Sequence, residues 1–369
     1  MNRVDRHIKI LVSGGGTGGH IFPAIAIANE FKERWASAEI LFVGAKGRME
    51  MKKVPQAGYP IQGLWISGLQ RSLSLENLMF PFKLISSIIN AKRIVKQFAP
   101  DIAIGTGGYA SGPALYAASK KRIPTVIQEQ NSYAGITNKL LGKRADAVCV
   151  AYNNMDKFFP REKIIHTGNP IRQELLDEAC SQEEARSYFD LDPNKKTILI
   201  VGGSLGARTF NNTMKAGLHT LKNADYQVMW QMGKNNYETY KNCEVAKLQH
   251  IKPMAFIDDM AKAYRAATLV ISRAGGAISE LSALSKAIIL VPSPNVAEDH
   301  QTKNAMSLVE KDAAILVKDS DAIESLLKIA ESTLKSEETL AQLSENINKL
   351  AKPNATQRIV DVIEKLINK

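Results

Sequence analysis

Short apolar runs alternate with amphipathic stretches along this 369-residue chain. The runs have the length of buried strands, and stretches between them, such as PAIAIANEFKERW, have helical periodicity. Parallel strands need a crossover between them, usually a helix, so the alternation predicts an α/β protein with parallel sheets. The strand-like runs are KILVSG (9–14), ILFVG (40–44), DIAIGTG (101–107), TVIQEQ (125–130), AVCVAY (147–152), TILIVGG (197–203), YQVMWQMG (226–233), TLVISRAG (268–275), AIILVPS (287–293) and AAILVK (313–318).

The series of runs is interrupted once, by a polar segment without a strand-like run at residues 168–193. A chain of this length exceeds one ordinary core and suits two domains. We therefore predict two Rossmann-like domains whose parallel sheets face a central cleft, with ligands at the carboxyl ends of the strands. The predicted parts are an N-terminal domain (1–166), a C-terminal domain (167–350) and a terminal helix (351–369) that packs back towards the N-terminal domain.

The basic charge of the chain lies in its first half. Residues 1–165 contain 23 Lys and Arg against 11 Asp and Glu, whereas the remainder contains 25 against 26. This one-sided charge favours an anionic partner, which is a nucleic acid, a phosphate-bearing substrate or an acidic membrane surface. A basic domain that is merely soluble is the alternative.

Several classes of protein do not fit the sequence. The three cysteines are far apart and odd in number, which predicts neither a metal-binding pair nor a disulfide framework. No apolar run reaches the ~18–20 residues of a membrane span, and the N-terminal residues lack the layout of a signal peptide. Asp190 and Asp192 spell DxD, but a cap or a turn suits them better than a metal, and Asp258 and Asp259 resemble a helix cap.

Three glycine-rich turns follow predicted strands: SGGGTGGH (13–20), GTGGYASGP (105–113) and GGSLGA (202–207). Glycine allows a tight turn and a close approach of the backbone. The helix that follows offers its unpaired N–H groups and its dipole to an anion. Turns of this kind in both domains predict an enzyme that binds a sugar diphosphate.

Two other functional interpretations of these turns remain possible, a dinucleotide-binding site and a hydrolase. The first turn satisfies G-x-G-x-x-G, but the second strand ends in GAKGR without the acid of an NAD site, which leaves NADP binding through Lys46 or Arg48. The third turn matches the nucleophile elbow G-x-S-x-G, with Ser204 at its centre. A hydrolase would also need an acid and a histidine later in the chain, and Asp299 with His300 is the only candidate pair.

Eight motifs occur in one order and cover about residues 8–360: GGGTGGHIFPAIAIA, GTGGYASGP, QEQNSYAGITNK, GNPIR, GGSLGAR, FIDDM, SRAGGAISE and EDHQTKNA. Together they resemble the bacterial MurG family. The resemblance implies the GT-B fold, no cofactor, no metal and no nucleic acid partner. It also implies an inverting transfer of N-acetylglucosamine from UDP-N-acetylglucosamine to lipid I (undecaprenyl-diphospho-N-acetylmuramyl-pentapeptide), which gives lipid II for peptidoglycan. A GT-B transferase with another lipid acceptor, or an NADP-binding oxidoreductase, is the alternative.

By this resemblance, the C-terminal domain holds the nucleotide sugar. Ser204 binds the diphosphate, and Arg172 contacts the nucleotide with a permanently charged, planar guanidinium group. The backbone of Ile257 faces the uracil. Glu280 binds the ribose diol, since a carboxylate accepts from both hydroxyls, and Gln301 binds hydroxyls of the donor sugar.

One segment departs from the family pattern. The family usually has one residue more between the positions of Arg273 and Glu280, and it commonly has glycine and proline at the positions of Ser285 and Ala287. One missing residue rotates the start of a helix by about 100°. Either the loop absorbs the deletion, or the ribose contact of Glu280 shifts.

The N-terminal domain contains the candidate catalytic residues. His20 is the first candidate for the base that takes the acceptor proton, because a histidine titrates near neutral pH. Its alternative role is to brace the loop or to bind phosphate. Glu129 is the second candidate base, and its alternative is a structural carboxylate that accepts hydrogen bonds from loop amides.

The resemblance assigns further N-terminal residues to substrates. Thr17, Gly18, Gly19 and Asn131 close over the donor sugar. Tyr109 contacts the acceptor, with a packing role as the alternative.

The stretch at residues 75–100 combines apolar side chains with Lys92, Arg93 and Lys96. Apolar residues beside a basic cluster suit docking on anionic headgroups. The alternative is a helix that faces the core and has a solvated basic end. We therefore expect a peripheral protein at the cytoplasmic face of the cell membrane, with an anionic membrane surface and cell-wall synthesis proteins as further partners.

Overall fold

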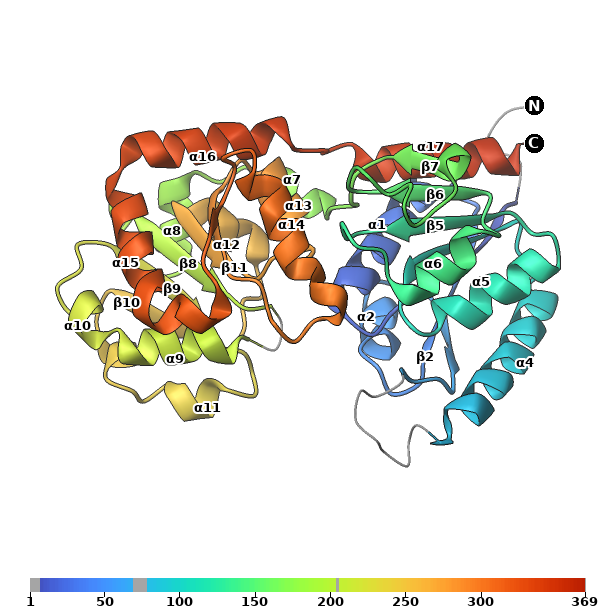
Figure 1. The fold of residues 1–369 in the computed structure, drawn as a ribbon, viewed down its shortest axis with the longest axis horizontal. Helices are drawn as coiled ribbons and strands as arrows, with labels where there is room; N and C mark the ends of the chain where they lie inside the picture. The colour runs from blue at the N-terminus through green and yellow to red at the C-terminus, as the bar shows by residue number, and fades with distance from the viewer. Residues whose placement is uncertain (1–6, 69–77, 204–205, 369) are drawn as a thin grey trace. The chain divides into compact units, whose positions relative to one another are not determined.

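The computed structural model describes residues 7–68, 78–203 and 206–368. The chain divides into two compact units, of which the first comprises Met1–Arg172 with Lys352–Lys369 and the second comprises Gln173–Ala351. Each unit has one sheet of parallel strands with helices packed on it (Figure 1). The prediction of two α/β domains with parallel sheets is confirmed.

The first unit contains a parallel sheet that has seven strands among the described residues. Strand β1 (Lys9–Gly14), which lies inside the sheet, is apolar and buried, as a strand covered by helices on both faces must be. Val12 of this strand pairs with Phe42 on one side and with Ile104 on the other. From edge to edge the strands are β3 (Ile61–Leu64), β2 (Glu39–Ala45), β1 (Lys9–Gly14), β4 (Ile102–Gly107), β5 (Thr125–Glu129), β6 (Ala147–Val150) and β7 (Ile164–His166).

Helices cover both faces of this sheet. One hydrophobic cluster joins the sheet to α1 (Gly18–Arg34) and α17 (Ala355–Ile367). A second cluster joins the opposite face to α4 (Phe80–Phe98), α5 (Ser111–Lys120) and α6 (Ile136–Gly142). The short helix α2 (Glu50–Gln56) follows β2.

Helix α17 belongs to the first unit although it comes last in the chain. It packs along α1, and Trp35 Nε1 donates to Glu364 Oε1 over 2.9 Å. Beside this buried bond, Arg34 forms an ion pair of 2.6 Å with Asp361. Apolar packing and two specific polar contacts therefore fix the terminal helix on this unit.

The second unit contains a parallel sheet with six strands in its described part. On one face lie α9 (Arg208–Ala216) and α15 (Ala322–Lys335). On the other lie α8 (Gln182–Tyr188), α12 (Met260–Ala266), α13 (Ala277–Ala283) and α14 (His300–Val309), and α16 (Glu337–Lys349) contributes to both clusters. From edge to edge the strands are β10 (Ile251–Met254), β9 (Gln227–Gln231), β8 (Thr197–Val201), β11 (Leu269–Ser272), β12 (Ala287–Leu290) and β13 (Ile315–Leu316).

The segment that departs from the family pattern contains a strained residue. Ser285, which follows α13, has a φ of 53°. Only glycine adopts this left-handed region without a steric cost, which is roughly 1–2 kcal/mol for other residues. The backbone at Ser285 thus has a conformation that suits glycine, the residue that the family resemblance leads us to expect there.

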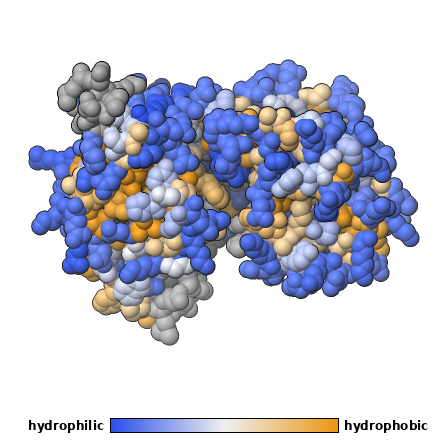
Figure 2. Space-filling view, turned by 180° about the vertical axis from the view of Figure 1, so that it is seen from behind, coloured by the Kyte–Doolittle hydropathy of each residue, from blue (hydrophilic) through white to orange (hydrophobic). Residues whose placement is uncertain are grey.

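The described helices include none that is long and apolar enough to cross a membrane. Hydrophilic residues cover most of the face shown in Figure 2, and hydrophobic residues form patches between them. Asp192 takes the predicted turn role, since its carboxylate accepts from the N–H of Asn194 over 2.9 Å.

Candidate active site

The first two glycine turns pack against each other at the carboxyl ends of β1 and β4. The N–H of Gly15 donates to the carbonyl of Gly107 over 3.2 Å, and the Thr106 hydroxyl donates to the carbonyl of His20 over 2.8 Å. A Cβ at Gly108 would lie 2.4 Å from the carbonyl oxygen of Gly15. Glycine is therefore needed at residue 108 for close approach, and these turns form one structure.

Glu50 fixes the first glycine turn and was not among the predicted site residues. Its carboxylate is fully buried and accepts from the N–H of Gly16 over 2.9 Å and from that of Ala45 over 3.0 Å. A Cβ at Gly15 would lie 2.2 Å from one carboxylate oxygen. An acid that follows the second strand thus binds the backbone of the first turn.

His20 lies half-buried in the first turn of α1, and its Nδ1 lies 2.9 Å from the carbonyl oxygen of Gly15. A carbonyl oxygen only accepts hydrogen bonds, so Nδ1 carries the proton. Nε2 then carries the lone pair when the ring is neutral. A Cβ at Gly107 would lie 2.9 Å from Nε2, so glycine at this position leaves space for the imidazole. The loop thereby fixes the orientation of the ring through the contact of Nδ1.

Glu129 lies at the end of β5 and is almost fully buried. One carboxylate oxygen accepts from the N–H of Asn131 over 3.0 Å. The other accepts from the N–H of Gly135 over 3.0 Å and from Nδ2 of Asn138 over 2.9 Å. This is the pattern expected of the structural alternative, because both carboxylate oxygens accept hydrogen bonds from groups of the loop and helix that follow β5.

A chain of buried amides joins this loop to the end of the first unit. Gln130 Nε2 donates to the carbonyl of Thr106 over 2.6 Å, and Asn169 Nδ2 donates to the carbonyl of Gln130 over 3.1 Å. The GNPIR segment is thereby attached to the strand ends that carry the glycine turns. Arg172, in the same segment, lies 5.5 Å from the ring centroid of Phe22 on α1.

The remaining predicted residues of the first unit lie at the same strand ends. Thr17 is the N-cap residue of α1, and Gly18 and Gly19 are its first two residues. Tyr109 is 47% exposed and lies against Gly68, where a Cβ would come within 2.1 Å of the tyrosine Cζ. The carboxyl ends of the strands in this sheet therefore bring together five predicted residues, which are Thr17, Gly18, Gly19, His20 and Tyr109.

In the second unit, a glycine turn joins β8 to α9. Gln231 braces this turn, because its Oε1 accepts from the N–H of Gly202 over 3.2 Å and its Nε2 donates to the carbonyl of Gly203 over 2.9 Å. A Cβ at Gly206 would lie 2.1 Å from the carbonyl oxygen of Met232. Ser204 lies outside the described residues.

Two predicted donor-binding residues lie at the same end of the second sheet. Glu280 is half-buried in the first turn of α13, with Tyr264 Oη 3.3 Å from its carboxylate. Gln301, near the start of α14, accepts from the N–H of Ser293 over 2.8 Å through Oε1. Its Nε2 faces the turn before α13, 3.9 Å from the Cβ position of Gly275. Both side chains therefore flank the loops after β11 and β12.

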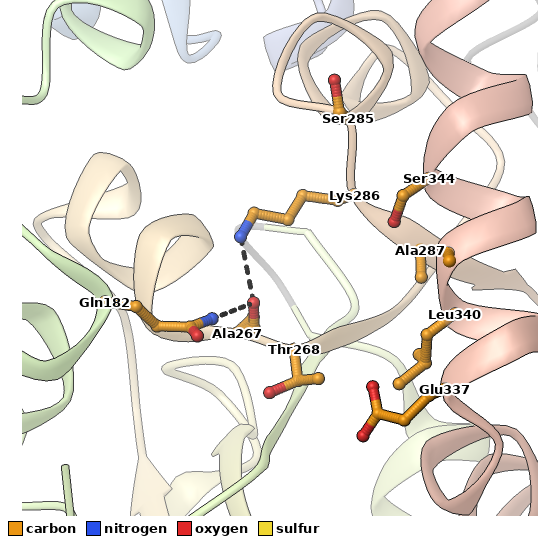
Figure 3. Close-up of a pocket in the computed structure, with 10 residues that line it drawn as sticks. Gln182, Ala267, Thr268, Ser285, Lys286, Ala287, Glu337, Leu340 and Ser344 are labelled. Atoms are coloured by element: carbon orange, nitrogen blue, oxygen red, sulfur yellow. Dashed lines mark hydrogen bonds between the residues drawn. The ribbon is translucent and has the colours of Figure 1, made fainter. Parts of the chain in front are cut away.

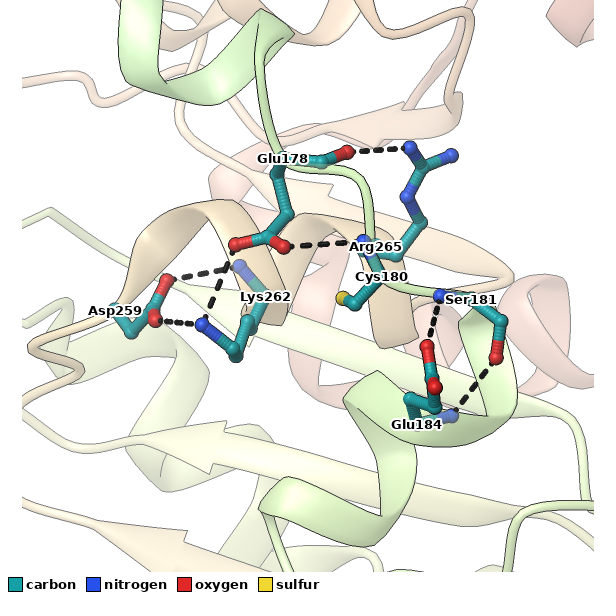
Figure 4. Close-up of polar contacts among 7 residues, drawn as sticks. All are labelled: Glu178, Cys180, Ser181, Glu184, Asp259, Lys262 and Arg265. Atoms are coloured by element: carbon teal, nitrogen blue, oxygen red, sulfur yellow. Dashed lines mark hydrogen bonds and ion pairs between the residues drawn. The ribbon is translucent and has the colours of Figure 1, made fainter.

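Ile257 lies in the loop before α12, where it is buried and packs in the hydrophobic cluster on this side of the sheet. Figure 4 shows the polar network that fixes this helix: Lys262 Nζ lies 2.8 Å from Asp259 and 3.3 Å from Glu178. Asp259 is the predicted helix cap and accepts from the N–H of Lys262 over 2.9 Å. Burial raises the pKa of Asp259, but the hydrogen bonds from Lys262 lower it by more, to below its ordinary value.

A cavity of about 250 Å³ lies at the opposite end of this sheet, where β11 and β12 begin. Figure 3 shows Lys286 in its wall, donating from Nζ to the carbonyl of Ala267 over 3.0 Å. Burial, with the nearby charges of Arg265 and Arg186, lowers the pKa of Lys286 to about 8. The cavity is therefore separate from the strand ends that carry the predicted donor-binding residues.

Two family descriptions match the chain, the glycosyltransferase family 28 N-terminal domain over residues 10–150 and the glycosyltransferase family 28 C-terminal domain over residues 197–359. The chain therefore belongs to glycosyltransferase family 28.

Similar proteins show which branch of this family the chain belongs to. Proteins of Cytophaga hutchinsonii and Flavobacterium psychrophilum are 55% and 54% identical, over 98% and 97% of this chain and 97% and 98% of their own lengths. Both are named UDP-N-acetylglucosamine–N-acetylmuramyl-(pentapeptide) pyrophosphoryl-undecaprenol N-acetylglucosamine transferase. The crystal structure of MurG from Acinetobacter baumannii is similar with a TM-score of 0.77 and 31% identity, covering 98% of this chain and all of that one. The chain is thus a member of the MurG family, and the prediction from its motifs is confirmed.

The fold extends beyond that family. The UDP-GlcNAc 2-epimerase of Neisseria meningitidis, solved with UDP-GlcNAc, matches with a TM-score of 0.70 at 15% identity over 97% of this chain. This likeness concerns the GT-B fold alone.

Proposed function

We propose that this chain transfers N-acetylglucosamine from UDP-N-acetylglucosamine to lipid I and so makes lipid II for peptidoglycan. The observation that carries the proposal is the identity of 54–55% along nearly the whole chain to two proteins named as this transferase. The glycine turns, the capped helices and the buried acids described above supply groups suited to this chemistry.

In this proposal the second unit binds the diphosphate of the donor. Helix α9 starts directly after the glycine turn that follows β8, and its first N–H groups have no partner within the helix. Such a terminus stabilises an anion through these groups and the helix dipole. Ser204 adds a hydroxyl, and Arg172 adds a charged donor for the departing UDP.

Three residues of the second unit bind the nucleoside and the sugar. Ile257 contacts the uracil through its backbone, since its side chain is part of the core. Glu280 accepts from the ribose hydroxyls. Gln301 donates from Nε2 to the sugar, because its Oε1 is already engaged by the N–H of Ser293.

Residues of the first unit bind the sugar and the acceptor. We assign Thr17, Gly18, Gly19 and Asn131 to the donor sugar, because exposed backbone and short side chains allow close approach. Tyr109 contacts the acceptor through the exposed part of its ring.

His20 acts as the general base. Its Nε2 takes the proton of the acceptor hydroxyl while the hydroxyl oxygen attacks the anomeric carbon of the donor sugar. The bond from that carbon to the diphosphate oxygen breaks, UDP leaves with the electron pair, and the configuration inverts. Glu129 positions Asn131 and Gly135 in this mechanism, because its oxygens are engaged by their amides.

The acceptor carries a long polyprenyl chain, and α4 is the element that suits docking on a membrane. Phe82, Ile85 and Ile89 recur at helical spacing and are 64%, 58% and 57% exposed. Lys92, Arg93 and Lys96 follow them, and residues 75–77 of the predicted stretch lie outside the described residues. The same helix buries Ser87, Ala91, Ile94 and Val95 against the sheet. An apolar stripe beside basic residues favours peripheral binding to anionic lipid at the cytoplasmic face.

Activity of a His20→Ala variant tests the mechanism. We expect kcat to fall about 10²- to 10⁴-fold, the usual contribution of a positioned base, with the affinity for UDP nearly unchanged. A transferase assay with a short-chain lipid I analogue gives kcat, and calorimetric titration gives the affinity. His219→Ala, an exposed histidine of the second unit, serves as the control.

Two outcomes would contradict the proposal. An equal loss of UDP affinity and turnover would make His20 a binding residue. Thermal stabilisation by NADPH but not by UDP-N-acetylglucosamine would reject the transferase in favour of an oxidoreductase.

A further inference from the structure

A groove of about 470 Å³ lies on the first unit, between strand β3 at the sheet edge and helix α4. Its lining includes two cations, three amide side chains and one indole ring, and it includes no acid. These residues are Lys46, Gln62, Trp65, Asn90, Arg93 and Gln97. The proposed function uses Arg93 only for docking on lipid and gives the other five no role.

The polar groups of this groove have few partners inside the protein. Within the part of the chain that the structure describes, the side chains of Lys46 and Arg93 form no ion pair. The amides of Gln62 and Gln97 form no hydrogen bond to another described residue. The amide of Asn90, by contrast, donates to the carbonyl of Ser86 over 2.9 Å. The groove therefore offers two positive charges and two amides to a ligand.

The dimensions of the groove match a short extended peptide. On α4 the lining runs from Ser86 to Gln97. At a rise of 1.5 Å per residue, this part of the helix is about 16 Å long. A peptide of five extended residues spans about 17 Å.

The groove begins at the carboxyl ends of the strands, where the candidate active site lies. Lys46 follows the carboxyl end of β2, and Trp65 follows that of β3. Three residues further, Gly68 lies against the ring of Tyr109. A ligand bound near Tyr109 can thus continue into the groove.

We propose that this groove binds the pentapeptide of the acceptor, with Lys46 and Arg93 holding its carboxylates and Gln62 and Gln97 pairing with its peptide groups. The inference rests on the proposed function, which supplies a pentapeptide as part of the acceptor. A guanidinium group binds a carboxylate through two parallel hydrogen bonds. A lipid headgroup would need the cations alone, whereas a peptide also needs partners for its N–H and C=O groups.

The experiment compares two water-soluble, short-chain lipid I analogues in the absence of membranes. One carries the pentapeptide with free carboxylates, and the other carries it with these carboxylates converted to amides. We expect Lys46→Ala and Arg93→Ala each to lower kcat/KM for the first analogue about tenfold, equivalent to about 1.4 kcal/mol, and to leave that for the second nearly unchanged. The KM for UDP-N-acetylglucosamine stays constant.

Lys52→Ala is the matched control, because it removes an exposed positive charge of the same unit that does not line the groove. Equal losses on both analogues would overturn the inference, and so would a wild-type enzyme that does not distinguish them. It would also be overturned if the variants lost binding to anionic vesicles and kept their selectivity, because the groove would then hold a lipid headgroup. Turnover of the amidated analogue keeps the proposed function intact in each of these cases.

Discussion

At the scale of single residues, Lys286 carries a positive charge in surroundings that disfavour it. Its ammonium group is largely buried near two guanidinium groups, and this lowers its pKa to about 8 from the ordinary 10.5. Because the unfolded chain binds the proton more tightly, the folded state is penalised at neutral pH, and the penalty decreases as pH rises from about 8 to 10.5. Lysine at this position therefore costs stability under ordinary conditions.

We predict that Lys286→Met raises the free energy of unfolding of the second unit at pH 7. The gain is at most about 3.5 kcal/mol, since each unit of pKa shift corresponds to about 1.4 kcal/mol. The advantage over the wild type shrinks as pH approaches 10.5. Urea unfolding at pH 7 and at pH 9.5 measures it, with Lys215→Met, at an exposed lysine of α9, as the control. An advantage independent of pH would mean that the effect comes from packing and not from charge.

At the scale of elements, the two glycine turns of the first unit act as one. Gly108 has a φ of +93°, and a side chain there would collide with the backbone of Gly15. Any side chain at residue 108 therefore displaces the first turn and, with it, the loop that orients His20.

We expect Gly108→Ala to lower turnover at least tenfold while the sheet stays folded, because the Cβ would lie 2.4 Å from a backbone oxygen that cannot move alone. Gly58→Ala is the matched control, since Gly58 also has a positive φ, +86°, but has open space around it. The control loses only the roughly 1–2 kcal/mol of backbone strain. Transferase assays and circular dichroism of both variants make the comparison. Equal activity of the two variants would show that contact between the turns is not needed.

The strands also show where the sequence was informative. The ten predicted runs are all present as strands, and most are fully buried, which produces a continuous apolar signal. The strands that were missed, β3, β7 and β10, all lie at sheet edges and are largely half-buried or exposed. An edge strand needs fewer apolar residues, so its pattern does not differ from that of a loop.

The site was predictable in part for a similar reason. Glycine turns reveal themselves locally, because their residues are adjacent in the sequence. The bond from Gly16 to Glu50 joins residues 34 positions apart, and no local pattern reports it. The available signal was Glu50, an acid shortly after the second strand. From the sequence we considered only the acid that an NAD site requires at the end of that strand, and found none there.

At the scale of the whole molecule, the chain passes from the first unit to the second and returns. Each unit has its own sheet and its own hydrophobic clusters. Two such units are expected to unfold in two transitions, and UDP is expected to raise only the transition of the second unit.

Ile363→Ala, in the buried face of α17, is predicted to destabilise the first unit by about 2–5 kcal/mol, the usual cost of this truncation in a core. Calorimetry should show a lower melting temperature for the transition that UDP does not shift. Ile323→Ala, at an isoleucine that is 51% exposed, is the control. A fall in both transitions would mean that α17 also supports the second unit.

The return of α17 to the first unit has a consequence for protein synthesis. The ribosome makes the strands and α1 of this unit first, but α17, the second helix on that face of the sheet, emerges only after all of the second unit. During translation the second unit can finish folding while part of the apolar face of the first unit is still uncovered. Nascent chains that stop short of Ala355 would keep that face open, which makes them natural clients for chaperones and targets for proteases.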